Sequence, residues 1–159
     1  MGPTIEGVAL TPLKIIPTRG GPVLHMLRAD SPRFTGFGEV YFSEVEPGEI
    51  KGWKRHLRMR QNFAVPRGQI RFVLYDDRPD SPTRGMVQEC ALGRPDNYCL
   101  LSLPPLLWYS FACTGAEPGL IANVTDLMHD PEESEVIPFE SELARKIPYK
   151  WAECRSDNR

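Results

Sequence analysis

Proline and glycine are spread so densely along this chain that long helices are excluded from most of it. There are 16 prolines and 13 glycines among 159 residues. Proline lacks the backbone N–H that a helix interior needs, and its ring clashes with the preceding turn. The short apolar and alternating runs between these residues therefore predict an all-β chain. The predicted strands cover residues 7–16, 23–27, 38–45, 51–58, 61–65, 69–76, 86–92, 98–103, 108–113 and 120–124.

Some of these strands are apolar on both faces, as in residues 70–75. Such strands belong to a sheet that is covered on both sides, and short strands at this spacing suit a sandwich or a barrel, of which a jelly-roll β-barrel fits best. The length suits one domain, which we place at residues 1–154, with short helical segments near the C-terminus. The acidic stretch 130–145 is interpreted either as a short helix or lid, or as a solvated surface segment. Residues 155–159 are expected to form a disordered tail.

The charge balance argues against a general attraction to polyanions. Nineteen Lys and Arg against 21 Asp and Glu give a formal net charge of -2. We expect neither nucleic acid nor a membrane as a partner, and any bound anion must be held by a local cluster. The N-terminus has neither a signal-peptide pattern nor a long apolar run, so a cytoplasmic location is expected.

The ligand pattern of metal-binding cupins fits this chain poorly. It asks for His-x-His and a carboxylate between two glycines, which fall on Gly48 and Gly68, and for a fourth ligand after a later proline. One imidazole beside a protonated lysine does not hold a divalent ion against water. We therefore expect no metal site. The four ligand positions fall on Lys54, His56, Gln61 and Tyr109.

The segment 71–85 carries the most specific motif, a strand ending in Asp77-Arg78 followed by Ser81-Pro-Thr-Arg-Gly85. It resembles the dTDP-4-dehydrorhamnose 3,5-epimerase family, and further likeness extends over nearly the whole chain. These further matches are Arg19-Gly20, Phe37-Gly-Glu-Val-Tyr-Phe-Ser43, Trp53 to His56, Asn62 to Val65, Pro104-Pro105 and Ile147 to Trp151.

The resemblance implies a homodimer that exchanges N-terminal strands and acts on a nucleotide-linked 4-keto sugar, the nucleotide being dTDP, GDP or CDP. A base removes a proton next to the ketone, the enolate is stabilised, and an acid returns a proton. No cofactor is implied. Two other outcomes stay open: a lyase or cyclase on another carbonyl compound, and a non-catalytic scaffold that binds sugar nucleotides.

The family's catalytic groups are altered in this chain. Lys54 stands at the position of the catalytic histidine, Tyr109 at that of a second histidine, and Asn123 near that of the catalytic tyrosine. Gln61 replaces a lysine, and His25 falls near a glutamate of the family. No clear counterpart of the aspartate that orients the histidine is found, and the acidic cluster 132–135 is interpreted as a solvated face.

Lys54, His56 and Tyr109 are the catalytic candidates. Lys54 and His56 alternate along one strand and share a face, where a desolvated lysine can act as a base. Alternatively, Lys54 is a rim residue paired with a carboxylate, His56 is structural, and Tyr109 is a core aromatic residue. Arg58 and Arg60 are expected to continue the same face as an anion pocket or a solvent face. The substrate-binding candidates are Arg19, His25, Glu39, Arg58, Arg60, Gln61 and Asn123.

Overall fold

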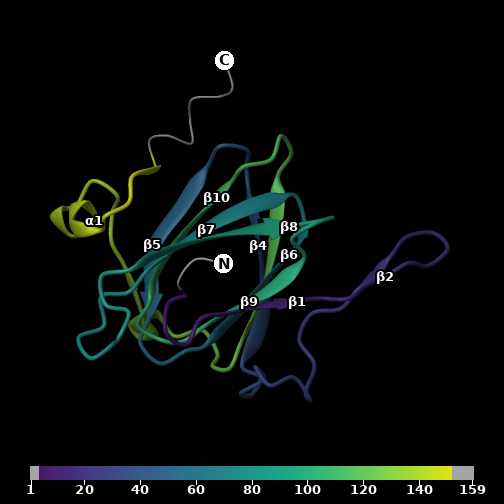
Figure 1. Ribbon diagram of the computed structural model, residues 1–159, viewed down its shortest axis with the longest axis horizontal. Helices are drawn as coiled ribbons and strands as arrows, with labels where there is room; N and C mark the ends of the chain where they lie inside the picture. The colour runs from purple at the N-terminus through teal and green to yellow at the C-terminus, as the bar shows by residue number, and fades with distance from the viewer. Residues whose placement is uncertain (1–3, 152–159) are drawn as a thin grey trace.

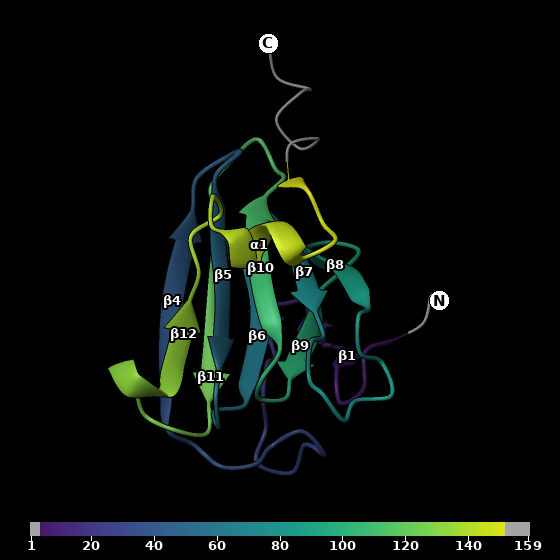
Figure 2. The same ribbon diagram turned by 90° about the vertical axis from the view of Figure 1, so that its left-hand side faces the viewer.

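The computed structural model describes residues 4–151, which form two packed five-stranded sheets. The expected tail at 155–159 lies outside the described residues. One sheet has the strand order β1 (Ala9–Pro12), β9 (Cys99–Leu103), β6 (Gln61–Arg67), β11 (Gly119–Thr125), β4 (Glu39–Val45). The other has the order β12 (Ser134–Val136), β5 (Ile50–His56), β10 (Trp108–Cys113), β7 (Gln69–Tyr75), β8 (Val87–Gly93). Figures 1 and 2 show the two sheets wrapped into a barrel. The predicted all-β jelly-roll fold is confirmed.

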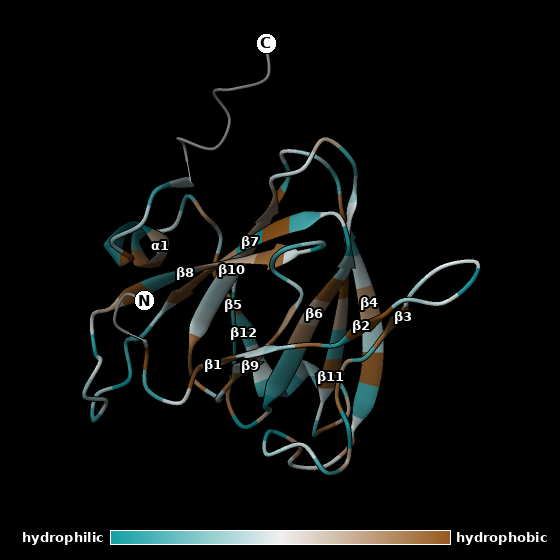
Figure 3. Cartoon of the chain, turned by 45° about the vertical axis from the view of Figure 1, so that its right-hand side comes forward, coloured by the Kyte–Doolittle hydropathy of each residue, from teal (hydrophilic) through white to brown (hydrophobic). Residues whose placement is uncertain are grey.

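A short hairpin leaves the barrel near the N-terminus. Strands β2 (Ile15–Ile16) and β3 (Val23–Leu24) pair only with each other and project from the body (Figure 1). Figure 3 shows a pale to hydrophilic loop at the tip of this hairpin. Its strands nevertheless expose apolar side chains, with Ile16 at 40% and Val23 at 50% exposure. A hairpin of this composition has apolar surface that its own barrel does not cover.

Strand β7 is apolar on both faces because each face packs against a different hydrophobic cluster. Ile70, Phe72 and Leu74 point into the barrel and pack in the main core. Val73 points the other way, into a second cluster with Trp53 and Ile147. That outer cluster is covered by the C-terminal segment, which carries the short helix α1 (Glu142–Lys146), as Figure 2 shows. The helical segment expected near the C-terminus is therefore present, and it serves to cover a sheet.

Strand β5 ends earlier than the sequence predicts. The expected strand 51–58 stops at His56, because the backbone N–H groups of Arg58 and Met59 both donate to the carboxylate of Glu133. Glu133 closes a 3₁₀ turn, η1 (Pro131–Glu133), which is capped by Asp130. The expectation that Arg58 and Arg60 continue the face of Lys54 and His56 is therefore wrong.

Candidate functional site

A cavity of about 250 Å³ opens between the two sheets of the barrel. Its walls come from β5 and β10 in one sheet and from β4 and β11 in the other, with Phe63 of β6 and Val136 of β12 at its sides. Three residues that the sequence singled out line it: Lys54, Tyr109 and Asn123. A few polar groups converging in a largely apolar cavity are typical of a small-molecule site.

Lys54 and Tyr109 are neighbours on one sheet. They face each other directly in the antiparallel ladder between β5 and β10, so their side chains point to the same side. The ladder shifts register just after Tyr109, where Gly52 approaches Ser110. A Cβ on Gly52 would lie 2.8 Å from the Ser110 Cα, and the residue has a φ of +118°, so glycine is required there.

Burial shifts the acid–base properties of this pair in opposite senses. Desolvation lowers the pKa of the half-buried Lys54 amine, although the nearby Glu133 carboxylate opposes the shift. Desolvation raises the pKa of the Tyr109 phenol far above its usual value, and the neighbouring Tyr41 adds to the effect. The amine is thus easier to use as a base, while the phenol keeps its proton and serves as a hydrogen-bond donor.

Tyr41 and Asn123 form a matching pair on the opposite sheet. They face each other in the ladder between β4 and β11, and Nδ2 of Asn123 donates to the Tyr41 hydroxyl at 2.7 Å. The same amide group donates to Oε1 of Gln61 at 3.0 Å. Gln61 is buried and lies close enough to the Tyr109 phenol to lower its pKa slightly against the effect of burial. Polar groups of the two sheets therefore come close together beside the cavity.

His56 lies behind Tyr109 and is bound to a buried carboxylate. Its Nδ1 is 2.6 Å from Oε2 of Glu133, and its ring stacks on that of Tyr109 with centroids 6.3 Å apart. Burial would raise the pKa of Glu133, but hydrogen bonds from Arg58, His56 and Met59 together lower it. The ionised carboxylate accepts the Nδ1 proton, which leaves the lone pair on Nε2. Nε2 is buried and has no partner within the described part of the chain.

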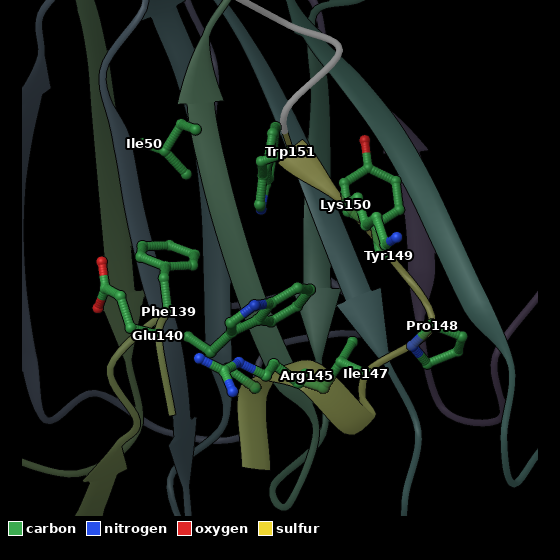
Figure 4. A pocket seen from close by; sticks show the side chains of 11 residues that line it. Ile50, Phe139, Glu140, Arg145, Ile147, Pro148, Tyr149, Lys150 and Trp151 are labelled. Atoms are coloured by element: carbon green, nitrogen blue, oxygen red, sulfur yellow. The ribbon is translucent and has the colours of Figure 1, made fainter. Parts of the chain in front are cut away.

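A larger cavity of about 1050 Å³ lies outside the barrel, between β5 and the C-terminal segment (Figure 4). Phe139, Tyr149 and Trp151 line it together with Arg145 and Lys150. None of the catalytic or substrate-binding candidates faces it. The barrel cavity, in contrast, is lined by three of those candidates, Lys54, Tyr109 and Asn123.

Comparison with known proteins decides the family. No protein-family model matches the sequence. A probable low-salt glycan biosynthesis epimerase of Haloferax volcanii is 31% identical over 142 residues, covering 87% of this chain and 90% of the relative. The chain belongs to the dTDP-4-dehydrorhamnose 3,5-epimerase-like family of cupins.

Two further proteins are similar to this chain over most of their length. The crystal structure of a dTDP sugar isomerase from Desulfovibrio desulfuricans G20 is 56% identical, with a TM-score of 0.89, and the match covers 93% of this chain and 92% of that one. A spore coat polysaccharide biosynthesis protein of Bacillus subtilis is 28% identical over 92% of this chain and 96% of its own length. The family resemblance seen in the sequence is confirmed.

The structure corrects the interpretation of the acidic cluster 132–135 and reveals the partner of His56. The cluster 132–135 is not a uniformly solvated face, because Glu133 is only 2% exposed and holds His56. Its neighbours Glu132 and Glu135 are exposed, and Glu135 pairs with Arg55. Nothing in the residue type separates Glu133 from these neighbours. Only the packing of the 3₁₀ turn against β5 does.

Tyr41 is the second residue that sequence reasoning missed. Glu39, Tyr41 and Ser43 alternate along β4 with Val40 and Phe42, and it is the polar series that faces inward. Phe42 is 63% exposed and Val40 48%. The usual rule that apolar residues face the interior therefore predicts the wrong inward face for this strand.

The remaining candidates are scattered. Glu39 begins β4, and Arg58 is exposed near Asp130. Arg60 is exposed on the side of the barrel, beside Arg33. Arg19 lies at the tip of the projecting hairpin, and His25 follows that hairpin, where its carbonyl accepts a hydrogen bond from Tyr98. Within this chain these five residues are not brought to the cavity that contains Lys54.

Residues 4–151 contain neither a cluster of metal ligands nor a membrane-spanning helix. No three side chains of histidine, cysteine, aspartate or glutamate gather as a metal site requires. No helix in that range is long and apolar enough to cross a bilayer.

Proposed function

We propose that this protein is an isomerase or epimerase that acts on a nucleotide-linked 4-keto sugar in the synthesis of a deoxysugar or surface polysaccharide. The observation that carries the proposal is the barrel cavity, where a desolvated lysine amine stands beside a buried phenol. The 56% identity to a dTDP sugar isomerase and the 31% identity to a probable glycan biosynthesis epimerase support it.

Lys54 is proposed as the base. A ketone makes the hydrogens on its neighbouring carbons acidic, and the neutral amine of Lys54 takes one of them. The electrons of the C–H bond move to the carbonyl oxygen, which becomes an enolate. The raised pKa of Tyr109 keeps its phenol protonated, so the phenol can donate a hydrogen bond to that oxygen. This hydrogen bond stabilises the negative charge of the enolate. The reaction uses no redox cofactor.

His56 and Glu133 support this arrangement from behind. His56 is not among the residues that line the cavity, but it stacks on Tyr109 and lies close enough to Lys54 for the two to affect each other's charge. Desolvation lowers the pKa of His56, so its ring is neutral. We assign it the role of positioning Tyr109.

The nucleotide diphosphate is proposed to bind with help from a second subunit. The projecting hairpin carries Arg19 at its tip and exposes Ile16 and Val23, which a partner barrel would cover. A homodimer with exchanged N-terminal strands would bring Arg19 and His25 to the partner's cavity. The name of the Desulfovibrio relative favours dTDP over GDP or CDP. The cytoplasm is the proposed location.

Neither the lyase or cyclase nor the non-catalytic scaffold is favoured by a specific feature of the cavity.

The proposed function is tested by looking for conversion of a 4-keto nucleotide sugar to an isomer. The protein is incubated with 4-keto sugars linked to dTDP, GDP, CDP and UDP, and the ring configuration is followed by proton NMR. We expect a new isomer from at least one dTDP-linked sugar. Unchanged spectra for all of them, at catalytic and at stoichiometric protein, reject the proposal.

A further inference from the structure

Two cross-strand pairs face the cavity from opposite sheets. Lys54 and Tyr109 are direct partners in the sheet that contains β5 and β10. Tyr41 and Asn123 are direct partners in the sheet that contains β4 and β11. All four side chains line the same cavity. A sugar ring held between the sheets therefore presents one face to each pair.

This arrangement limits what the Lys54 pair can do alone. To invert a carbon, an enzyme must remove the proton from one face of the ring and deliver a proton to the other. Lys54 and Tyr109 stand side by side on one sheet, so both reach the same face. Return of the proton from that side restores the starting configuration. The acid for inversion has to come from the opposite sheet.

Tyr41 has the geometry of such an acid. The backbone N–H of Asn62 donates to Oδ1 of Asn123 at 3.3 Å, which fixes the amide so that Nδ2 faces Tyr41. The Tyr41 oxygen accepts that bond, and within residues 4–151 it has no other hydrogen-bond partner. Its own proton is therefore free to be donated into the cavity.

We propose that Tyr41 is the catalytic acid that protonates the enolate from the face opposite Lys54, and that Asn123 is its positioning residue. This inference rests on the proposed epimerase function. The carbon gains the phenolic proton, the enolate electrons return to form the C–H bond, and the ketone is restored. Tyr41 is left as a phenolate, stabilised by the Nδ2–H of Asn123, and Lys54 as an ammonium. Exchange of one proton each with water returns both to their starting forms.

The inference also accounts for the asparagine on β11. The family resemblance places a catalytic tyrosine near position 123, where this chain has Asn123. The structure supplies a phenol at the same place from the adjacent strand, 2.7 Å from the asparagine amide. The hydroxyl function is thus kept while the residue that carries it has moved from β11 to β4.

The test separates proton removal from inversion. Wild type, Tyr41→Phe and Tyr109→Phe are incubated with a 4-keto nucleotide sugar in deuterated water. Deuterium uptake is measured by mass spectrometry and ring configuration by NMR. We expect wild type to take up deuterium and to invert the carbon. Y41F should still take up deuterium, but its rate of inversion should fall by at least about 100-fold. Y109F, which weakens enolate stabilisation, is expected to slow uptake and inversion together.

Other results of this experiment would overturn either the assignment of Tyr41 or the proposed function. Y41F that inverts within a few-fold of wild type, or that loses uptake and inversion in equal measure, overturns the assignment of Tyr41. No uptake by wild type rejects the proposed function itself, and the role of Tyr41 with it. Retained uptake by Y41F also serves as its folding control, since an unfolded barrel has no cavity in which to exchange the proton.

Discussion

Glu133 accepts a hydrogen bond from Nδ1 of His56 at 2.6 Å, although 77 residues separate the two in the chain. The same carboxylate receives the backbone N–H groups of Arg58 and Met59. One buried acid therefore ends strand β5, fixes the histidine tautomer and ties the 3₁₀ turn to the barrel.

Substitution of Glu133 by glutamine should destabilise the protein. The glutamine keeps the shape but loses the charge that strengthens three hydrogen bonds, which should lower the free energy of unfolding by about 1–3 kcal/mol. Urea unfolding followed by circular dichroism measures it. The matched control is Glu132→Gln on the exposed neighbour, which should change stability by less than about 0.5 kcal/mol. Equal effects of the two variants would argue against the buried role of Glu133.

The pH dependence of turnover should report Lys54. Only the neutral amine accepts a proton, so kcat/KM should rise with pH and level off above the pKa of Lys54. Because burial lowers that pKa, the rise should lie below the ordinary lysine value of about 10.4. Lys54→Arg, which stays protonated, should lose at least about 100-fold in rate. Lys146→Arg on the exposed helix α1 serves as the control. A profile independent of pH up to 10 in wild type excludes Lys54 as the base.

Asp76 should account for part of the stability that is lost in acid. Its buried carboxylate accepts hydrogen bonds from Arg78, Ser81 and Thr83. Burial opposes ionisation, but these bonds hold the pKa of Asp76 well below its usual range. The folded pKa is thus lower than the unfolded one, so the contribution is full above about pH 5 and fades as pH falls below about 4.

Asp76→Asn should therefore cost about 3 kcal/mol near neutral pH, because Arg78 loses its buried partner. The difference from wild type should shrink in acid. Asp80→Asn, in the exposed part of the same turn, is the control and should behave as wild type throughout. Thermal and urea unfolding between pH 2 and 7 give the comparison. A cost for D76N that stays constant over this range contradicts the account of Asp76.

Exchange of the hairpin between subunits predicts complementation. Lys54→Met should be inactive, and Arg19→Ala should bind the nucleotide weakly. A hybrid dimer of the two has one site with both residues intact. Random pairing makes half of the dimers hybrids, so co-refolded protein should recover roughly a quarter of wild-type activity at low substrate. Recovery no greater than the sum of the separate variants, or a monomer in sedimentation, contradicts strand exchange.

The sequence predicted the barrel and most strands, because these depend on local patterns, and alternation placed Lys54 and His56 on one face. Two more cavity residues, Tyr109 and Asn123, were singled out by the family resemblance. Tyr41 and Glu133 depend on contacts between distant segments instead. The partner of Tyr41 is 82 residues away, and β4 buries its polar residues while exposing Phe42. Arg58 and Arg60 left the expected face because Glu133 caps the strand before them.

The most direct test of the central claim is solvent exchange at the carbons beside the ketone. Wild type and Lys54→Met are incubated in deuterated water with 4-keto nucleotide sugars, and the mass of the recovered sugar is measured over time. The account predicts that wild type adds one or two deuterium atoms next to the ketone of a dTDP-linked sugar, while K54M matches the protein-free background. Wild type that matches the background for every such sugar would contradict it.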